Sequence, residues 1–188
     1  MSRPPNPEIR AQLREKAIDY VLANGIADLS LRPLAKVLKT NARMLVYHFG
    51  SREGLMREIL GGLREREDAR VQAWFRGKST QRTMAEFLRW YWRRVSAPKA
   101  RPAARLVFEL YALALRDPES YPGVLTSPVA YWQGLLARAG VHGASGPEAT
   151  LLLASFRGLL LDLCATGDEI RVRKGMEMLA NLLEREGL

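Results

Sequence analysis

Apolar residues recur at helical spacing along most of this chain, and no segment shows the period-two alternation expected of a β-strand. Breaks rich in Pro and Gly separate the helical segments, as at Gly50-Ser51, Pro98 to Pro102 and Gly140 to Pro147. Together these features predict an all-α fold with about nine helices. The predicted helices are Glu8 to about Asn24, a short helix capped by Ser30, Ala42 to about His48, a long helix capped by Ser51, Thr80 to Ser96, Ala103 to Arg116, Val129 to Ala139, Glu148 to Ala165 and Ile170 to Glu186.

The chain is long enough for a substantial core and carries a strong positive charge. Its 188 residues are 47% hydrophobic, which argues against a disordered chain. The 29 Lys and Arg residues exceed the 20 Asp and Glu residues by nine. This balance favours a polyanionic partner, either nucleic acid or an anionic membrane surface, and charge alone does not choose between them.

Targeting and metal-binding signals are weak. The first 12 residues lack the apolar core of a signal peptide. The most apolar stretch, Leu151 to Ala165, is interrupted by Arg157 and Asp162, and falls short of the 18 or so uninterrupted residues of a membrane span. A single cysteine, Cys164, excludes a disulfide within the chain, and two histidines make a Cys/His zinc site implausible. We expect a soluble cytoplasmic protein that holds no cofactor or metal and does not bind a membrane.

Residues 29 to 52 form a strongly basic part of the chain. They include five Lys or Arg residues and no Asp or Glu. Two short helices are predicted here, separated by a tight turn at Lys39-Thr40, with Asn41 as the cap of the second. Packed against the first helix of the chain, such a pair leaves one surface free for the DNA major groove.

The second of these short helices offers suitable side chains for DNA. Arg43 has the donor geometry for a guanine edge, and Ala42 and Met44 offer apolar contact to thymine methyl groups. Tyr47 and His48 are candidates for phosphate contacts. From the charge pattern alone, a solvated surface is an equally good interpretation. The full set of candidate DNA-contacting residues is Ser30, Arg32, Asn41, Ala42, Arg43, Met44, Tyr47, His48 and Arg52.

The segment from Ser30 to Leu55 contains several short motifs in a characteristic order and spacing. Ser30 opens a helix that contains Leu34-Ala35; Leu45-Val46-Tyr47-His48-Phe49 and Ser51-Arg52-Glu53-Gly54-Leu55 follow. This pattern resembles the N-terminal module of the tetracycline-repressor (TetR) family of bacterial regulators. The resemblance implies a three-helix DNA-binding domain at the N-terminus, followed by a helical body that binds a small ligand and dimerises through its last two helices.

Four positions depart from the family pattern. Val46 stands where the family usually places a phosphate-binding tyrosine, which predicts that this contact is lost or passed to Tyr47. Lys39 replaces the usual turn glycine and is therefore expected to adopt an unusual, left-handed backbone. Arg43 occupies a position that is often glycine, whereas Arg52 replaces a lysine and keeps its charge. These changes affect the expected operator sequence more than the fold.

The last two predicted helices suit an interface. Leu151 to Ala165 is apolar nearly all round, and the final helix carries a stripe that includes Val172, Met176 and Leu183. Paired with their symmetry copies, the two helices would form a four-helix bundle. A monomer could also use these faces as its own core.

Aromatic residues in the C-terminal body predict an effector cavity. Glu109 is the single acid in an apolar stretch of the helix that ends at Arg116, so it must be paired, reach solvent or bind a ligand. Each aromatic residue, taken singly, is better explained as ordinary core; as a set they suggest an apolar, aromatic or amphipathic effector. The candidate ligand-binding residues are Phe87, Trp90, Tyr91, Phe108, Glu109, Tyr111, Trp132 and Phe156.

The sequence therefore predicts a DNA-binding domain at 1–50 and an effector-binding and dimerisation domain at 51–188. The expected function is a homodimeric regulator, a repressor of a palindromic operator that a small ligand releases. No phosphate loop, nucleophile elbow or metal-ligand cluster supports an enzyme. Two alternatives stay open: a non-specific basic protein that coats DNA, and a helical small-molecule carrier or enzyme that does not bind DNA specifically.

Overall fold

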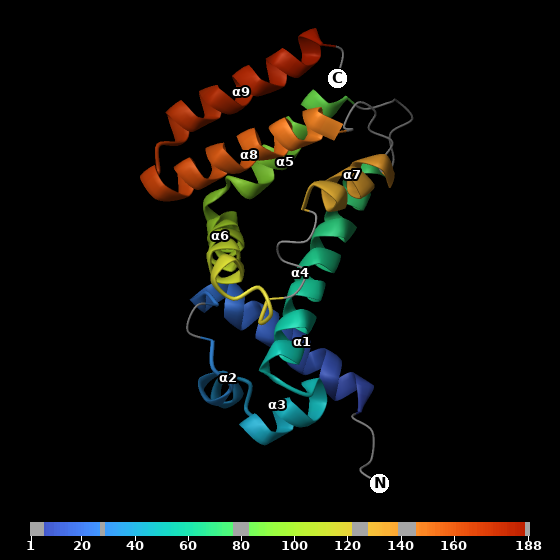
Figure 1. Ribbon diagram of the computed structural model, residues 1–188, viewed down its shortest axis with the longest axis vertical. Helices are drawn as coiled ribbons and strands as arrows, with labels where there is room; N and C mark the ends of the chain where they lie inside the picture. The colour runs from blue at the N-terminus through green and yellow to red at the C-terminus, as the bar shows by residue number, and fades with distance from the viewer. Residues whose placement is uncertain (1–5, 27–28, 77–82, 122–127, 139–145, 187–188) are drawn as a thin grey trace. The chain divides into compact units, whose positions relative to one another are not determined.

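The computed structural model describes residues 6–26, 29–76, 83–121, 128–138 and 146–186. These residues form nine α-helices and one 3-10 turn, with no strand among them (Figure 1). The predicted all-α fold is confirmed. The helices are α1 (Pro7–Asn24), α2 (Leu31–Val37), α3 (Ala42–Phe49), α4 (Arg52–Phe75), α5 (Met84–Val95), α6 (Arg101–Arg116), α7 (Pro128–Arg138), α8 (Gly146–Thr166) and α9 (Glu169–Arg185).

The helix ends follow local capping chemistry. The Asn6 side chain accepts hydrogen bonds from two backbone N–H groups at the start of α1, and Gly25, at a φ of 80°, ends that helix. Ser51 accepts a hydrogen bond from Gly54 N at 3.0 Å and caps α4, as predicted. At α5, Thr83 and Glu86 form a reciprocal capping box, so the described helix begins at Met84; the predicted start at Thr80 lies outside the described residues.

The chain divides into two compact units. Unit 1 comprises Met1–Ala69 and Glu109–Thr126, and unit 2 comprises Arg70–Phe108 and Ser127–Leu188. Helices α4 and α6 each contribute residues to both units. The boundary between the compact units therefore differs from the predicted domain boundary at residue 50. That predicted division concerns function and stays a prediction.

Unit 1 is built on α1, against which α4 packs closely. A Cβ added at Gly62 would lie 2.3 Å from Ile18 Cδ1 and 3.1 Å from Arg14 Nε, so this glycine permits the close approach. Ion pairs join the same helices at their edges: Arg10 with Glu58 at 2.6 Å, for example. The buried apolar core of unit 1, to which α2 and α3 also contribute, includes Ala17, Ile18, Val21, Leu34, Ala35, Leu45, Phe49, Leu55, Met56 and Ile59.

Unit 2 is held together mainly by α5, α8 and α9, with α7 against α8; α8 and α9 run side by side in Figure 1. Arg89 on α5 bridges to three acceptors on α9, donating to Glu177 Oε2 at 2.9 Å, to Asn181 Oδ1 at 2.6 Å and to Glu184. The hydrogen bonds from Arg89 hold the pKa of Glu184 below its usual range. Beneath this bridge, aromatic and aliphatic side chains form one continuous core.

Candidate nucleic-acid interface and effector cavity

The turn between α2 and α3 has the geometry that the sequence predicts. Lys39 adopts a φ of 54°, the left-handed conformation expected where a glycine is usual. Thr40 N donates to Ala35 O at 2.9 Å and closes the turn. Asn41 then caps α3 by accepting a hydrogen bond from Met44 N at 2.9 Å. The two short helices are thus fixed as a helix-turn-helix.

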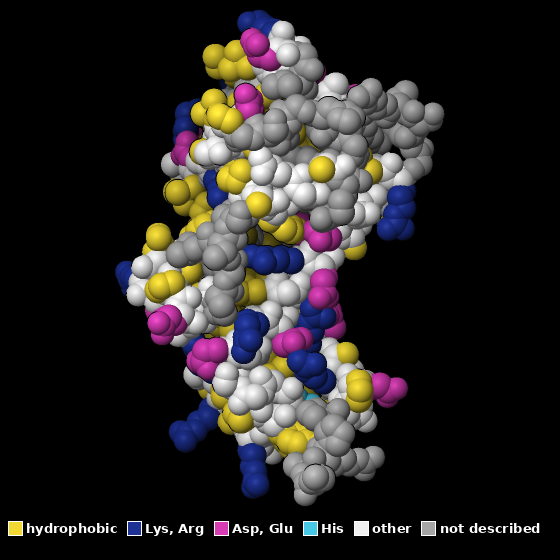
Figure 2. Space-filling model, turned by 45° about the vertical axis from the view of Figure 1, so that its right-hand side comes forward, with side chains coloured by type: hydrophobic (Ala, Val, Ile, Leu, Met, Phe, Trp, Pro, Cys, Tyr) yellow, Lys and Arg dark blue, Asp and Glu magenta, His cyan; other side chains and the backbone are white. Residues whose placement is uncertain are grey.

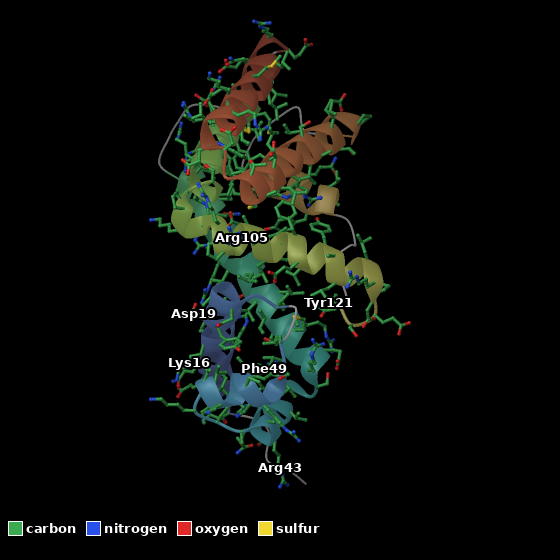
Figure 3. All side chains as sticks on the ribbon, turned by 90° about the vertical axis from the view of Figure 1, so that its left-hand side faces the viewer. Lys16, Asp19, Arg43, Phe49, Arg105 and Tyr121 are labelled. Atoms are coloured by element: carbon green, nitrogen blue, oxygen red, sulfur yellow. The ribbon has the colours of Figure 1, made fainter. Side chains whose placement is uncertain are left out.

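Helix α3 has a buried side and an exposed side. Leu45 and Phe49 face the core, whereas Arg43, Val46 and Tyr47 are exposed. The spacing of three and four residues places these exposed side chains together on what we call the outer face of α3. Arg43 projects away from the helices of unit 1, and Phe49 lies among them (Figure 3).

The surface around this face is positively charged. Arg32, Lys36, Lys39 and Arg43 are all exposed, and the segment 29–52 has no acid to offset them. Figure 2 shows Lys and Arg side chains projecting from unit 1 with hydrophobic patches between them. Basic side chains interspersed with exposed apolar ones suit the DNA major groove, which is bordered by phosphates and exposes thymine methyl groups on its base edges.

Two of the predicted DNA contacts have other partners in the structure. Arg52 is half-buried, and its Nε donates to Leu29 O at 3.1 Å, which holds the backbone just before α2. Asn41 uses its side-chain oxygen as the cap of α3. Arg52 therefore has a positioning role that the charge pattern did not indicate.

His48 departs from the prediction. Its side chain is only 5% exposed, and neither ring nitrogen has a hydrogen-bond partner among the described residues. It lies at ring-contact distance from its neighbours Tyr47 and Phe49. The helical period turns residue 48 toward the core together with Leu45, so the predicted phosphate contact by His48 has no surface from which to form.

The remaining predicted positions are compatible with a surface role. Ser30 occupies the N-cap position of α2, but its exposed side chain makes no capping hydrogen bond. Met44 is 37% exposed at the edge of the outer face, and Ala42 is half-buried.

An apolar cavity of about 30 Å³ lies inside unit 2. That volume holds about one or two water molecules. Four of the eight predicted ligand-binding residues line it, namely Phe87, Tyr91, Trp132 and Phe156. The other lining residues are Met84, Leu88, Gln133, Ala149, Leu152 and Leu153.

The rings around the cavity contact one another directly. The Tyr91 ring lies 4.9 Å from Trp132 at 76° and 5.4 Å from Phe156, while Phe87 is stacked on Tyr91 at 5.6 Å. Such geometries are favourable for aromatic pairs. Gln133 is the one amide side chain in the lining, and sequence reasoning missed it although it directly follows Trp132.

The other four predicted ligand-binding residues do not line the cavity. Trp90 and Phe108 are partly buried against the same core cluster, and Trp90 stacks on Trp74 at 4.8 Å. Tyr111 and Glu109 belong to unit 1. There Glu109 accepts a hydrogen bond from Ile26 N at 3.0 Å, so it is a paired carboxylate.

No lining residue carries a charge, and the guanidinium carbon of Arg94 lies 5.7 Å from the centre of the Tyr91 ring. Cys164 lies on α8, where burial raises the pKa of its thiol. No group of three or more potential metal ligands occurs in the described part of the chain.

Helices α8 and α9 expose large apolar side chains. Only 22% of the most apolar window of α8 is buried. By length and composition alone, Pro147–Thr166 is apolar enough to cross a membrane, a test that the core helix of a soluble protein also passes. Gly158 on α8 has open space where a side chain would be. The exposed apolar residues on the two helices are Leu151, Leu161, Ile170, Met178 and Leu182.

A basic helix-turn-helix in one unit and an aromatic-lined cavity in the other define a helix-turn-helix protein with a separate helical body. No family model and no curated protein matches the chain. Among solved structures, the multidrug binding protein EbrR complexed with imidazole is 28% identical, with a TM-score of 0.71 over 97% of this chain and 94% of that one. EbrR complexed with proflavin is 25% identical, with a TM-score of 0.66 over 93% and 99%.

A protein from Rhodococcus sp., described as a TetR-family transcriptional regulator, is 18% identical, with a TM-score of 0.61 over 95% of this chain and 98% of that one. The chain has the fold of the TetR-family transcriptional regulators. The resemblance predicted from the residues between Ser30 and Leu55 is confirmed.

Proposed function

We propose that this protein is a ligand-responsive transcriptional regulator of the cytoplasm, a repressor that binds a palindromic operator as a homodimer and is released by a small aromatic effector. The observation that carries the proposal is the outer face of α3, exposed and basic within a segment that has no acid. A face of this kind at the second helix of a helix-turn-helix is the part that enters the major groove.

The side chains of this face divide into two roles. Arg43, which projects from α3, is our candidate for reading a guanine edge. Arg32, Lys36 and Lys39 are placed to contact phosphates, which position the protein without reading sequence. Val46 stands where the family usually has a tyrosine that binds phosphate, and valine cannot make that hydrogen bond. We therefore assign the aromatic phosphate contact of α3 to Tyr47.

A homodimer accounts for the exposed apolar side chains of α8 and α9. Two such helices from each copy would form a four-helix bundle that buries them. The open space at Gly158 allows a partner helix to approach closely. A dimer also supplies two reading heads, which a palindromic site requires at about 34–36 Å apart.

The effector is an uncharged planar aromatic molecule. The cavity lining offers rings, methyl groups and one amide but no charge, and placing an ion there without a counter-charge is strongly unfavourable. EbrR, at 25–28% identity, is complexed with imidazole and with proflavin, which supports a small aromatic ligand in this fold.

Operator selection from random DNA, followed by fluorescence anisotropy with the selected site, tests the proposal. We expect a palindrome bound at least about a thousandfold more tightly than unrelated DNA at the same salt concentration. Arg43→Ala should weaken specific binding by about 1–3 kcal/mol and relax the sequence preference at one base pair of each half-site. Lys174→Ala, which removes an exposed charge from α9, is the matched control and should have little effect.

Two results would contradict this proposal. Binding that has no sequence preference at any salt concentration indicates a protein that only coats DNA. The Val46 departure favours a second candidate, a helical carrier or enzyme without specific DNA binding. For that candidate, the double variant Arg43→Ala with Tyr47→Ala keeps full biological activity, whereas a regulator loses it.

A further inference from the structure

The positive charge of the chain is concentrated in two segments. Residues 29–52 carry five Lys or Arg and residues 87–108 carry six, and neither segment contains an Asp or Glu. The other 142 residues have 18 Lys or Arg against 20 Asp or Glu. The first segment contains the helix-turn-helix, whereas the second lies wholly within unit 2 and runs from α5 through the 3-10 turn at Pro98–Ala100 into α6. DNA binding by α3 therefore does not explain the charge of the second segment.

Three of the six basic residues in the second segment have partners within unit 2. Arg89 on α5 pairs with Glu177 at 2.9 Å, and Arg101 at the start of α6 pairs with Glu169 at the start of α9. Arg94 lies over an aromatic ring of its own helix. Contacts within the fold account for these three charges.

The other three basic residues of this segment, Arg93, Lys99 and Arg105, are exposed. None of them makes a hydrogen bond or ion pair with another described residue. A cation in the last turn of a helix is favoured by the helix dipole, which accounts for Arg93 on α5. The dipole gives no such reason for Lys99 and Arg105, which flank the first turn of α6, where acids are favoured and none occurs.

Arg173 on α9 adds a fourth exposed cation, which also lacks an ion pair among the described residues. The two ion pairs show that α9 runs antiparallel to the chain from α5 to α6, because the earlier arginine, Arg89, pairs with the later glutamate. Arg173 lies four residues from each of these glutamates and therefore on the same side of α9. Arg93 follows Arg89 by one turn, so the two exposed arginines lie at the same level of the helix pair.

We call these four residues, Arg93, Lys99, Arg105 and Arg173, the body patch. They surround the place where the end of α5 and the starts of α6 and α9 meet (Figure 1). Leu182 follows Arg173 by nine positions and lies on the opposite side of α9. A dimer formed through the exposed apolar side chains of α8 and α9 would therefore leave the body patch accessible.

A nucleic-acid backbone fits the body patch better than a protein or a membrane surface does. Val107, at 42% exposed, is the one large apolar side chain exposed in residues 87–108. Protein interfaces are built around buried apolar and aromatic anchors, and helices that bind membranes insert an apolar face. The phosphates of DNA, by contrast, are bound by Lys and Arg side chains without such anchors.

We propose that the body patch binds the phosphate backbone of a second segment of double-stranded DNA while α3 occupies the operator. The contact has no sequence preference, because phosphates position a protein without specifying bases. One dimer then bridges two duplexes or two distant sites on one duplex. The choice of DNA as the polyanion rests on the proposed function, whereas the charge of the body patch is a property of unit 2 by itself.

Capture of a second duplex by the full-length protein tests the proposal. The selected operator is fixed to beads and saturated with protein, free protein is washed away, and a labelled duplex of unrelated sequence is added. A patch variant replaces all four residues of the body patch by Gln. At about 50 mM salt, beads with the unaltered protein should retain at least about tenfold more labelled duplex than beads with the patch variant. Operator affinity should differ by less than about threefold between the two proteins, because the body patch lies outside the helix-turn-helix.

A control variant makes the same change of net charge elsewhere. It replaces four other exposed basic residues, and it should capture as much labelled duplex as the unaltered protein does. Circular dichroism checks that both variants are folded. The control substitutions are Arg76→Gln, Arg116→Gln, Lys174→Gln and Arg185→Gln.

A second measurement does not depend on the operator. A head variant, Arg32→Gln with Lys36→Gln and Arg43→Gln, removes exposed charges around α3. Its affinity for an unrelated duplex, measured by anisotropy, should fall by about a hundredfold between about 50 and 200 mM salt, as expected for four phosphate contacts. Adding the patch substitutions to the head variant should weaken this binding by at least about tenfold at about 50 mM salt.

The outcomes separate the inference from the proposed function. Equal capture by the unaltered protein and the patch variant overturns the inference, and so does an equal loss in the control variant, which would show that net charge alone is responsible. If the patch substitutions abolish binding to phosphatidylserine vesicles but leave DNA capture unchanged, the partner is a membrane surface and the inference is wrong. If the unaltered protein shows no operator preference, the proposed function fails instead. The head variant then still decides whether the body patch binds DNA.

Discussion

His48 has an unusual environment for a histidine. It is buried beside Leu45 and Phe49 with no hydrogen-bond partner for either ring nitrogen among the described residues. A buried polar group without a partner costs about 1–3 kcal/mol. His48 is therefore better understood as a core residue of α3 than as a DNA contact.

Replacing His48 by leucine tests this assignment. We expect His48→Leu to leave the free energy of unfolding unchanged or to raise it by about 1 kcal/mol, because an unsatisfied polar group is removed. Operator affinity should change by less than about threefold. Chemical denaturation and anisotropy measure the two quantities; a large loss of DNA binding without loss of stability would show that His48 reaches DNA after all.

For single residues, the sequence predicts a conformation or a hydrogen bond best when it depends only on neighbouring residues in the chain. The left-handed Lys39, the Asn41 cap and the Ser51 cap each depend on residues within three or four positions and are confirmed. The partners of Arg52 and Glu109 lie 23 and 83 positions away, so only the folded chain brings them together. Nothing in the local pattern distinguishes a basic residue that contacts phosphate from one that holds a backbone carbonyl.

At the scale of elements, α4 contains two glycines with opposite requirements. A Cβ at Gly54 would lie 2.0 Å from Phe49 O, a backbone atom at the end of α3, whereas one at Gly61 would be 3.7 Å from Arg14. Gly54 is thus required for α4 to start so close to α3. Gly61 has room for a methyl group.

These two glycines give a matched pair of alanine variants. Gly54→Ala should lower the free energy of unfolding by about 1–3 kcal/mol, because the backbone at the end of α3 must move. Gly61→Ala should raise it by up to about 1 kcal/mol through better helix propensity. Thermal or urea denaturation compares them, and equal effects would contradict the close contact at Gly54.

The junction of α8 and α9 is held by charges that depend on pH. Arg171 donates to both oxygens of Asp162, at 2.6 and 2.8 Å, and thereby holds the pKa of that carboxyl below its usual value. A carboxyl group with a lowered pKa stabilises the fold while it is ionised. Its contribution is therefore complete above the unfolded value and is lost as the pH falls through the lower, folded pKa.

Asp162→Asn should accordingly be less stable than the unaltered protein at pH 7, and the difference should shrink steadily below about pH 4. Urea denaturation across that range measures it. The effect at pH 7 is expected to be small because the pair is exposed. Glu186→Gln removes another exposed carboxylate of unit 2 and should show no such pH dependence; a difference that persists at low pH would contradict the ion pair.

Element boundaries were predictable because Pro, Gly and capping residues mark them. Each predicted helix has a counterpart, and the predicted ends that fall on described residues differ from the observed ends by a few residues at most; the predicted start at Thr80 and the predicted end at Ala139 lie outside the described residues. Helix α6 begins at Arg101 rather than Ala103, since Pro102 fits the first turn. Proline therefore marks the start of this helix, whereas the prediction took it as a break.

At the scale of the whole molecule, the exposed apolar side chains of α8 and α9 lead to a prediction about assembly. The protein should have the mass of a dimer by light scattering. The double variant Leu161→Glu with Met178→Glu should be monomeric, because charged groups cannot be buried unpaired at the interface. Its operator affinity should fall by at least about tenfold, since one head alone grips half a palindrome.

Leu115→Glu serves as the control for this variant. Leu115 is 73% exposed on α6, outside the two predicted interface helices. The substitution makes the same chemical change and should leave the dimer intact. A dimer that persists in the double variant, or that Leu115→Glu disrupts, would place the interface elsewhere.

The cavity could be predicted only in part. Aromatic residues of α5 and α8 were identifiable as a set, because helical spacing puts Phe87 and Tyr91 on one face. Which rings border the empty space depends on how α5, α7 and α8 pack, which no single segment determines. Trp90 and Tyr111 were predicted for the same reason, as aromatic residues of the C-terminal body, but neither of them lines the cavity.

The small size of this cavity affects the effector concentration at which the protein responds. A tricyclic ring needs several times the 30 Å³ present, so on the proposed function the rings have to separate before an effector enters. The free energy of that opening lowers the apparent affinity in every binding event. The protein then responds at higher effector concentrations, and the concentration that gives half of the response is set by the packing of Phe87, Tyr91, Trp132 and Phe156. Substitutions that loosen these rings would make a more sensitive detector with its DNA preference unchanged.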